Sequence, residues 1–365
     1  MIMLSVFLHV VLCRGEAGKM SKVMVAMSGG VDSSVAALLL NEQGYDCFGA
    51  TMRLFADVCS PDDESVDDAR DAAMQIGIPF QVYDFTDAFS LHVINNFTNA
   101  YMNGKTPNPC IDCNRHIKFG CFYDAAGEYG ADFVATGHYA RIVCENGRYL
   151  LKKGADRSKD QSYVLYTLTQ EKLARTLFPL GGLTKPDVRG IALDNGFGNA
   201  GKSESQDICF IPDGDYAGFL ERSADFALAP GSFVDVDGNI VGEHKGLHRY
   251  TIGQRRGLGI SAGESLYVVS VDPESNTVTV GNRDSVFSRA LQARDINLIA
   301  VDRIDAPLRV SAKIRYRQTE QPATVRQLDD DLLHVEFDEP QRAITKGQAV
   351  VLYDGDIVVG GGTIC

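Results

Sequence analysis

The chain has 365 residues, of which 45% are hydrophobic, and its formal net charge at pH 7 is −13. This length and apolar content predict two or three domains with cores of their own, and the charge argues against a protein that is basic all over and binds nucleic acid by charge alone. The nine cysteines are an odd number in a long chain. They argue against a disulfide scaffold and favour a reducing cytoplasm.

Residues 1–19 precede the first predicted element and are not expected to belong to the fold. The run Met1–Cys13 is apolar but too short to cross a bilayer, and it lacks the positively charged stretch that opens a secretory signal. Met20-Ser21-Lys22 resembles a natural start. We interpret residues 1–19 as a misassigned start or as a disordered or loosely docked extension, and we expect a cytoplasmic protein with no membrane attachment.

The first element is a strand, a glycine turn and a helix in direct succession. Residues 23–27 form an apolar run typical of a buried strand, Ser28-Gly29-Gly30 predicts a tight turn, and residues 31–41 have an apolar helical face. Such a turn directs backbone N–H groups and the positive end of the helix dipole at one point. The arrangement favours an anion such as phosphate.

The side chains of this turn add to its chemistry. Ser28, Ser33 and Ser34 supply hydroxyl groups, and Asp32 supplies a carboxylate for a magnesium ion beside the phosphates. The Lys-Ser or Lys-Thr pair of a Walker loop and the Gly-x-Gly-x-x-Gly spacing of dinucleotide folds are both absent. A turn whose glycines serve only backbone geometry is the alternative. The segment resembles the PP-loop ATP pyrophosphatase superfamily, with its signature Ser-Gly-Gly-x-Asp-Ser, which implies cleavage of ATP to AMP and pyrophosphate and activation of a carbonyl oxygen as an adenylate.

Strand and helix signals alternate as far as residue 138. Strands are expected at 45–52, 80–85 and 132–136, and helices at 65–77, with Ser65 as N-cap, at 87–102 and at 114–129. This order predicts an α/β parallel sheet with helices on both faces and a ligand at the carboxyl ends of the strands. The superfamily resemblance implies the same fold, that of the adenine nucleotide alpha hydrolase-like proteins.

After residue 213 the chain changes to short alternating runs with Gly, Asp-Gly and Asn turns, which predict all-β structure. Strands are expected at 232–236, 265–271, 277–280, 309–316, 323–327, 332–337 and 349–353. We therefore divide the chain into the extension 1–19, a PP-loop ATP-binding catalytic domain 20–213, a small central β-rich domain 214–285 and a C-terminal β-barrel 286–365. Two groups of cations in the β part are candidate RNA-binding surfaces, with solvated strand faces as the alternative: Lys245, His248, Arg249, Arg255 and Arg256, and Lys313, Arg315 and Arg317.

Three cysteines lie in segments with chemical potential. Cys110 and Cys113 form a Cys-x-x-Cys pair just before the predicted helix 114–129, where a helix N-terminus is expected to lower the pKa of the Cys113 thiol. The pair is compatible with a redox pair, half a zinc site or part of an iron–sulfur site, and zinc is disfavoured because no second ligand pair has a suitable spacing. Cys209 lies where the α/β part ends, a place where loops often cover active sites. A small buried apolar residue is the alternative for Cys209.

Together these stretches resemble one family, the bacterial tRNA-specific 2-thiouridylases, from about Lys22 to the C-terminus. Seven segments carry the resemblance in order: 26–33, 106–119, 135–141, 159–163, 207–211, 246–260 and 313–317. The resemblance implies that ATP adenylates the C2 oxygen of the wobble uridine in certain tRNAs and that sulfur then replaces it. It implies ATP and Mg²⁺ as cofactors, and tRNA and a sulfur-donor protein, either a persulfide carrier or a cysteine desulfurase, as partners.

The same resemblance implies roles for individual residues. Cys209 matches the persulfide cysteine, and Cys113 matches the nucleophile that releases the sulfur or resolves a disulfide with Cys209, as thiol exchange allows. Asp32 joins them as a catalytic residue because of its place in the turn. The nucleotide-binding positions are Ala26, Met27, Ser28, Gly29, Gly30, Val31, Asp32, Ser33, Met52 and Gly137. The tRNA-contacting positions are Asn108, Pro109, Cys110, His138, Lys159, Asp160, Gln161, Arg315, Tyr316 and Gln348.

One position departs from the family pattern. Many members carry Asp where this chain has Cys110. With Cys110, Cys113 and Cys209 all present, three thiolates have the composition to hold a [4Fe–4S] cluster with one open iron for sulfide. We favour the persulfide mechanism, and the cluster mechanism and a different adenylating PP-loop ligase stay as alternatives.

Overall fold

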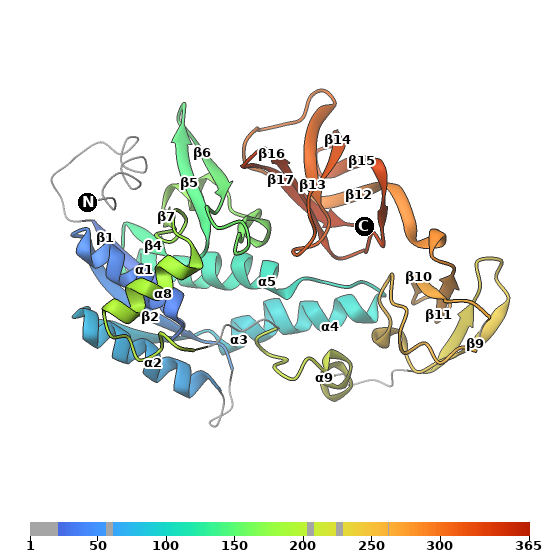
Figure 1. Cartoon of the computed structure of the whole chain (residues 1–365), viewed down its shortest axis with the longest axis horizontal. Coiled ribbons are helices and arrows are strands. Elements are labelled where there is room, and N and C mark those ends of the chain that lie inside the picture. The colour runs from blue at the N-terminus through green and yellow to red at the C-terminus, as the bar shows by residue number, and fades with distance from the viewer. Residues whose placement is uncertain (1–20, 56–60, 203–207, 224–228, 262) are drawn as a thin grey trace.

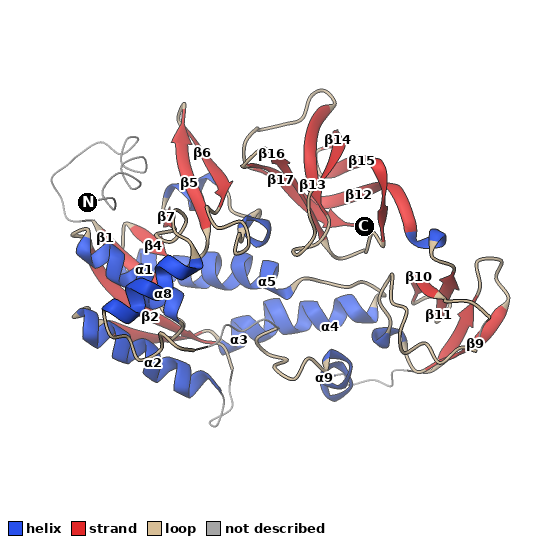
Figure 2. Cartoon of the chain, viewed as in Figure 1, coloured by secondary structure: helices blue, strands red, loops and turns tan. Residues whose placement is uncertain are grey.

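The computed structural model describes residues 21–55, 61–202, 208–223, 229–261 and 263–365. The predictions made for residues 1–19 lie outside these ranges, as do Cys13, Cys59 and the segment 203–207 that leads to Cys209. Within the described ranges, no helix is both long and apolar enough to cross a membrane. Figure 2 shows helices gathered around the N-terminal sheet and strands dominating the rest of the chain.

A five-stranded parallel sheet organises the N-terminal part of the fold (Figure 1). Its strands are β1 (Lys22–Ala26), β2 (Asp46–Arg53), β3 (Phe80–Asp84), β4 (Phe133–Ala135) and β7 (Thr176–Leu177), in the order β3-β2-β1-β4-β7. Successive residues of β1 point to opposite faces, so that Val23 and Val25 enter one apolar core while Met24 and Ala26 enter another. The predicted parallel α/β fold is confirmed.

Helices cover both faces of this sheet. One face packs against α1 (Val31–Glu42), α2 (Pro61–Ile76) and α8 (Lys185–Asp194), and the other against α6 (Phe122–Tyr129). Helix α2 begins before Ser65, so the predicted N-cap is wrong. Proline favours the first position of a helix, and Pro61 occupies it here. Because β1 has β2 on one side and β4 on the other, a crevice is expected at their carboxyl ends, where the strand order reverses.

Two long helical stretches follow β3, and each contains a π-helical segment. The first consists of α3 (Thr86–Phe89), η1 (Ser90–Ile94) and α4 (Asn95–Met102), and the second of α5 (Pro109–Asp112), η2 (Cys113–Cys121) and α6. The second stretch was expected to begin at Asn114, which is wrong. Asn108 caps it by accepting a hydrogen bond from the Cys110 N–H at 3.1 Å, and Pro109 takes the first position. Cys113 therefore lies inside a helix and not at its N-terminus.

A β-hairpin leaves the parallel sheet and reaches the C-terminal barrel. It consists of β5 (Ala140–Glu145) and β6 (Arg148–Lys153). Its turn residues Asn146 and Gly147 have φ angles of 52° and 80°, as a tight hairpin with a type I′ turn requires. Strand β6 pairs with β17 (Ile357–Ile364) through Lys152 and Ile357. The hairpin was not among the predicted elements.

The C-terminal half consists mainly of β-strands, as predicted, with a short helix and two 3₁₀ turns among them. A four-stranded sheet contains β8 (Gly231–Val234), β9 (Ile240–His244), β10 (Tyr267–Asp272) and β11 (Thr277–Gly281). The barrel contains β12 (Phe287–Leu298), β13 (Leu308–Lys313), β14 (Gln321–Asp329), β15 (Leu332–Arg342), β16 (Ala349–Asp354) and β17, and pairing of β12 with β17 closes it. Two short helices, η3 (Ser162–Leu165) and α7 (Gln170–Ala174), lie between β6 and β7. The C-terminal half contains α9 (Tyr216–Ser223), η4 (Leu247–Arg249) and η5 (Asp284–Val286).

Candidate active site

The turn between β1 and α1 is built so that glycine is required in it. Gly29 has a φ of 73°, and a Cβ atom on it would lie 2.3 Å from the carbonyl oxygen of Ser65, so both backbone conformation and space exclude a larger residue. Gly30 is the N-cap of α1 and makes no side-chain cap. The first-turn N–H groups of α1 therefore stay available for an anion.

Hydroxyl and amide groups hold this turn in shape. Ser33 Oγ accepts a hydrogen bond from the Ser28 N–H at 3.1 Å and donates to the Gly30 carbonyl oxygen at 2.9 Å. Asn199 Nδ2 donates to the Gly29 carbonyl oxygen at 2.7 Å and to Ser34 Oγ at 3.0 Å. The hydroxyls thus act first as supports of the loop, and Asn199 is a support that sequence reasoning missed.

A pocket of about 200 Å³ opens at this turn, at the carboxyl ends of β1, β2 and β4. We call it the nucleotide pocket, after the predicted nucleotide-binding residues that line it. Six of the predicted nucleotide-binding residues line it, namely Ala26, Ser28, Asp32, Ser33, Met52 and Gly137, together with Lys118, Thr136, His138 and Gln161. Met27, Gly29, Gly30 and Val31 belong to the same turn without lining the pocket. Gly137 packs directly on α1, because a Cβ on it would lie 2.9 Å from the carbonyl carbon of Asp32.

Asp32 is held by two partners from distant parts of the chain. Lys185 Nζ donates to its two carboxylate oxygens at 2.7 and 2.8 Å, and the Tyr139 hydroxyl donates to Oδ1 at 2.7 Å. Lys185 is buried as the first residue of α8. Neither partner was predicted, since no local pattern links them to Asp32.

The predicted thiols of Cys110, Cys113 and Cys209 influence one another electrostatically. Desolvation by the surrounding protein raises the pKa of Cys113 to about 11, that of Cys209 to about 12 and that of Cys110. The Cys113 and Cys110 thiols raise the pKa of Cys209 further, so the three thiols lie within electrostatic range of one another. Water still reaches Cys110 and Cys209, which have exposed surface. The expected lowering of the Cys113 pKa is wrong, because burial outweighs a helix terminus that lies one turn away.

Aromatic packing fixes the position of Cys209. The neighbouring Phe210 ring contacts Phe89, Phe97 and Phe219 with centroid distances of 5.8, 5.4 and 5.3 Å. Phe210 also belongs to the apolar cluster that includes Cys113. In this arrangement all three cysteines are free thiols. Within the described ranges, no set of three His, Cys, Asp or Glu side chains is arranged to hold a metal ion.

A larger groove of about 950 Å³ adjoins the nucleotide pocket and shares Asp32 and Gln161 with it. We call it the interdomain groove, because residues of the N-terminal half, from Asp32 to Gln161, and residues of the barrel line it together. Its lining includes five cations, namely Lys153, Arg157, Lys159, Lys313 and Arg317. Four predicted tRNA-contacting residues line it as well: Lys159, Asp160, Gln161 and Tyr316.

The other predicted tRNA-contacting residues lie elsewhere. Arg315 donates to the Ala343 carbonyl oxygen, and burial lowers its pKa. Gln348 Nε2 donates to the carbonyl oxygens of Thr106 and Pro107 at 2.8 and 3.2 Å. The barrel therefore supports the segment that leads into α5, the helix that carries Cys110. His138 is buried in the nucleotide pocket. The remaining three, Asn108, Pro109 and Cys110, form the start of α5.

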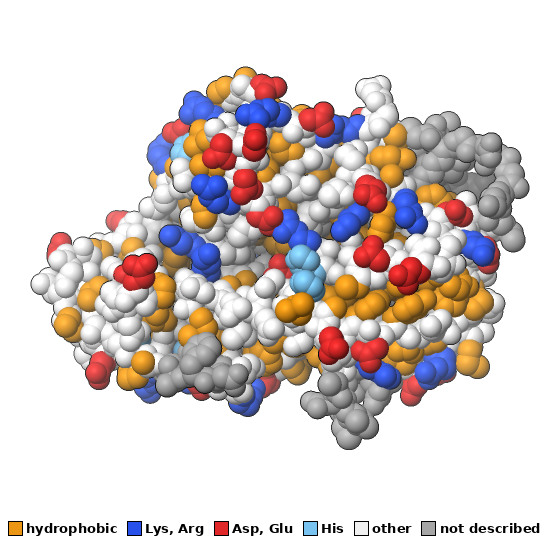
Figure 3. All heavy atoms as spheres, turned by 180° about the vertical axis from the view of Figure 1, so that it is seen from behind, with side chains coloured by type: hydrophobic (Ala, Val, Ile, Leu, Met, Phe, Trp, Pro, Cys, Tyr) orange, Lys and Arg blue, Asp and Glu red, His pale blue; other side chains and the backbone are white. Residues whose placement is uncertain are grey.

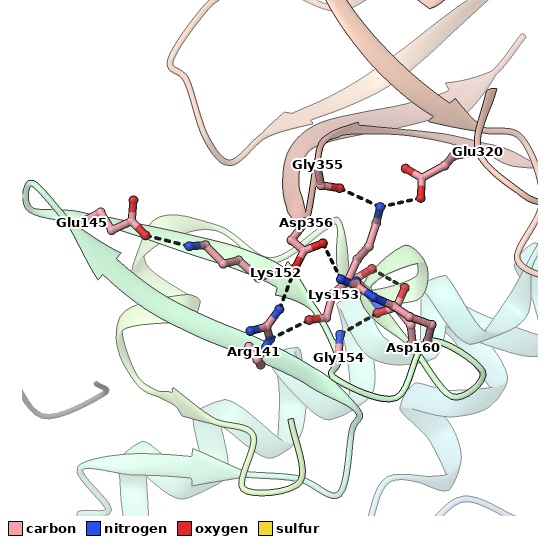
Figure 4. Close-up of polar contacts among 11 residues, drawn as sticks. Arg141, Glu145, Lys152, Lys153, Gly154, Asp160, Glu320, Gly355 and Asp356 are labelled. Carbon is pink, nitrogen blue, oxygen red and sulfur yellow. Dashed lines mark hydrogen bonds and ion pairs between the residues drawn. The ribbon is translucent and has the colours of Figure 1, made fainter. Parts of the chain in front are cut away.

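Ion pairs join the β5–β6 hairpin to the barrel at the edge of this groove (Figure 4). Arg141 Nη2 donates to Asp356 Oδ2 at 3.0 Å, and Lys153 Nζ donates to the Gly355 carbonyl oxygen at 2.7 Å and pairs with Glu320. Arg157 pairs with the second oxygen of Asp356. Lys153 is buried and lies 4.5 Å from the centroid of the Tyr353 ring. These contacts hold the two walls of the groove together.

Comparison with known proteins gives a consistent result. Family models match three parts of the chain: a tRNA methyl transferase HUP domain at residues 21–213, a tRNA methyl transferase PRC-barrel domain at 217–282 and an Aminomethyltransferase beta-barrel domain at 288–364. The tRNA-specific 2-thiouridylase MnmA of Clostridioides difficile is 51% identical over 354 residues, which cover 94% of this chain and 98% of the relative. The protein of the same name from Acetivibrio thermocellus is 50% identical over 94% and 99% of the two chains.

Solved structures resemble the chain more distantly. The U34-tRNA thiolase NcsA from Methanococcus maripaludis, with its [4Fe-4S] cluster, is 18% identical, with a TM-score of 0.36 over 56% of this chain and 67% of that one. A 4-thiouridine synthetase in complex with RNA and ATP is 17% identical, with a TM-score of 0.38 over 55% and 50%.

Proposed function

The chain belongs to the tRNA-specific 2-thiouridylase family, and from this premise we propose that it replaces the C2 oxygen of the wobble uridine in tRNA by sulfur, in a reaction driven by ATP. The observation that carries the proposal is the continuity of the nucleotide pocket, through Asp32 and Gln161, with a groove that five cations and four carboxylates line. The description of the matched family model names methyl transfer, whereas the relatives that align over nearly the whole chain are named thiouridylases.

The first step is adenylation of the uridine. ATP lies in the pocket of about 200 Å³ with its phosphates on the turn 28–33 and the N-terminus of α1. The C2 oxygen of the uridine attacks the α-phosphorus, and the bond to the β-phosphate breaks and releases pyrophosphate. The oxygen then leaves readily as part of AMP, which explains why a thiolating enzyme needs a PP-loop.

The second step is sulfur transfer through the two thiols. The terminal sulfur of a Cys209 persulfide attacks C2, the C2–O bond breaks, and AMP departs with the electron pair. The Cys113 thiolate then attacks Cys209 Sγ, which leaves the sulfur on the uridine and a disulfide between the two cysteines. A dithiol reductant restores the thiols. The electrostatic proximity of Cys113 and Cys209 supports this sequence.

Magnesium fits this site as a companion of ATP. Asp32 lines both the pocket and the groove, and its oxygens already accept hydrogen bonds from Lys185 and Tyr139. Its carboxylate is the group that would hold Mg²⁺ beside the phosphates, where the ion would neutralise phosphate charge. Lys185 then shares Asp32 with the ion or turns to the phosphates.

The cluster mechanism has less support, because the three thiols are not arranged as a metal site within the described ranges. It stays the alternative to the persulfide, and iron and sulfide analysis of anaerobically purified protein, with a thiolation assay on the same sample, distinguishes the two.

We propose that tRNA enters through the interdomain groove. The net charge of −13 does not oppose this, because binding depends on where the cations lie, and five of them line this one groove. Four carboxylates, of Asp32, Asp160, Glu320 and Asp356, line the groove as well. Basic and acidic side chains are also interspersed on the face shown in Figure 3. The first of the two predicted basic groups includes His248 and Arg249. Both pair with Glu221 of α9 and hold that helix in place. We further propose that a sulfur-donor protein delivers the sulfur to this enzyme and that the reaction takes place in the cytoplasm.

The test is a thiolation assay with mass spectrometry of the tRNA nucleosides. Wild-type protein with ATP, Mg²⁺, unmodified tRNA and a persulfide donor is expected to form 2-thiouridine. A PP-loop ligase that attaches nitrogen needs neither cysteine, so full product formation by Cys113→Ser and Cys209→Ser variants would favour that rival. A non-catalytic RNA-binding module predicts no ATP turnover, and an Asp32→Ala variant indistinguishable from wild type would favour it.

A further inference from the structure

Lys118 is a cation in the nucleotide pocket that the proposed function has not used. It lines the pocket of about 200 Å³ together with Ser28, Ser33 and His138. Other lysines near the active site have acidic partners, since Lys185 pairs with Asp32 and Lys153 with Glu320. Lys118 forms no ion pair with any residue in the described part of the chain. An unpaired ammonium group that faces a phosphate-binding turn is placed to bind phosphate.

The π-helix η2 contains both Cys113 and Lys118, and the charge of Lys118 acts on the Cys113 thiol. The two residues are five positions apart, which on an α-helix separates side chains by about 140° around the axis. In a π-helix the backbone bonds connect residues five apart, and the Phe122 N–H accordingly donates to the Ile117 carbonyl oxygen. Phe119, where the backbone departs from helical angles, is fully buried and anchors this irregular turn.

The charge of Lys118 reaches the groups on both sides of it. On the thiol side it lowers the pKa of Cys110, Cys113 and Cys209 against the larger effect of burial, while Asp112 acts in the opposite direction on the first two. On the pocket side it adds to the burial that holds the pKa of His138 well below its usual range. His138 therefore stays neutral, and Lys118 supplies the positive charge between the two sites.

We propose that Lys118 is a catalytic residue shared by both half-reactions, which binds the α-phosphate during adenylation and then attracts the anionic sulfur to the same place. This inference rests on the proposed function. When the C2 oxygen attacks, Lys118 balances the negative charge that builds on the α-phosphate. When sulfur attacks C2 and AMP leaves, the same ammonium group faces both the departing phosphate and the arriving sulfur. Its positive charge reduces the repulsion between these two anions.

The experiment compares Lys118→Gln and Lys118→Arg with wild type and with Lys152→Gln, which removes a lysine that pairs with Glu145 on the hairpin. Adenylation is measured as tRNA-dependent exchange of labelled pyrophosphate into ATP. We expect Lys118→Gln to lose about 100-fold or more in the exchange rate, the range seen when one transition-state donor is removed. Lys118→Arg should recover part of the rate, and Lys152→Gln should match wild type.

A second readout reports the local charge without any turnover. Alkylation of Cys113 by anionic iodoacetate and by neutral iodoacetamide is compared at one pH, with the modified peptide quantified by mass spectrometry. Lys118→Gln should lower the iodoacetate-to-iodoacetamide rate ratio several-fold, and Lys118→Arg should keep it, whereas a merely structural role would leave the ratio unchanged. An unchanged ratio, or exchange within twofold of wild type, would overturn the inference. Failure of the wild type itself to thiolate tRNA would instead contradict the proposed function.

Discussion

Lys185 donates hydrogen bonds to both carboxylate oxygens of Asp32, across a sequence separation of 153 residues. This contact joins the N-terminus of α1 to that of α8, two helices that pack on the same face of the parallel sheet. The Lys185 side chain is 6% exposed and that of Asp32 is 30% exposed. The pair is therefore desolvated enough for the loss of one partner to leave an uncompensated charge.

The first prediction concerns the stability of this pair. Lys185→Met is expected to lower the free energy of unfolding by about 2 kcal/mol, less than a fully buried pair because water reaches Asp32. Asp32→Asn in the same background should recover part of that loss, since it removes the orphaned charge. A double-mutant cycle on the thermal unfolding of the two single variants and the double variant measures this coupling. Strictly additive losses would contradict the coupling.

The second prediction separates the thiols by role. Cys113→Ser and Cys209→Ser should abolish thiolation and leave pyrophosphate exchange near the wild-type rate, because adenylation needs neither sulfur. Cys110→Asp, which installs the residue common in the family, should keep thiolation. The measurements are nucleoside mass spectrometry and pyrophosphate exchange on the same preparations. Loss of both thiolation and bound iron in an anaerobically purified Cys110→Asp protein would favour the cluster mechanism.

The glycine turn between β1 and α1 could be predicted from the sequence, but the partners of its Asp32 side chain could not. The segment 28–33 contains all the local information that a tight turn needs, including a glycine at the positive φ of residue 29. Lys185, Tyr139 and Asn199 meet the turn only because the fold brings α8, the segment after it and the loop after β4 to this edge of the sheet. Long-range pairings of this kind leave no periodic signal in one sequence.

Two misses, however, had local signals. Asn108-Pro109 is the expected pattern of an N-cap followed by proline at the first helical position, and it places the helix start at Pro109 and Cys113 inside the helix. Asn146-Gly147 is the strongest short signal for a hairpin, and β5 and β6 flank it. The attachment of β6 to β17 had no such signal, because the paired residues Lys152 and Ile357 lie in different halves of the chain.

The third prediction concerns pH and follows from the raised thiol pKa values. Burial raises the pKa of Cys113 to about 11 and that of Cys209 to about 12. At neutral pH both groups are therefore protonated in the free enzyme, and the thiolate fraction rises about tenfold for each pH unit below the pKa. Alkylation of either cysteine by iodoacetamide should increase in that proportion from pH 7 to pH 10 without a plateau. A plateau near pH 7 would mean a lowered pKa, as first expected for a helix N-terminus.

The fourth prediction concerns the hairpin–barrel contacts. Lys153 is buried and satisfies both the Gly355 carbonyl and Glu320. Lys153→Met should lower the free energy of unfolding by about 2 kcal/mol, because it leaves those acceptors without their donor. Lys152 is the neighbour of Lys153 in the sequence and forms an exposed ion pair with Glu145. Lys152→Met should lower the free energy of unfolding by less than about 1 kcal/mol. Equal thermal shifts for the two variants would show that the buried contact does not hold the barrel to the hairpin.

The last prediction distinguishes cations that contact tRNA from cations that support the fold. Lys159 lines the interdomain groove, whereas Arg315 donates to a barrel carbonyl oxygen and does not line it. If tRNA phosphates lie in the groove, Lys159→Ala should reduce the slope of log affinity against log salt by about 1, as expected for one lost phosphate contact. Arg315→Ala should weaken tRNA binding only by disturbing the barrel, and it should leave the slope of log affinity against log salt unchanged. Affinities measured by filter binding at several salt concentrations provide both slopes. A reduced slope for Arg315→Ala alone would place the tRNA surface outside the groove, on the side of the barrel that carries Arg315.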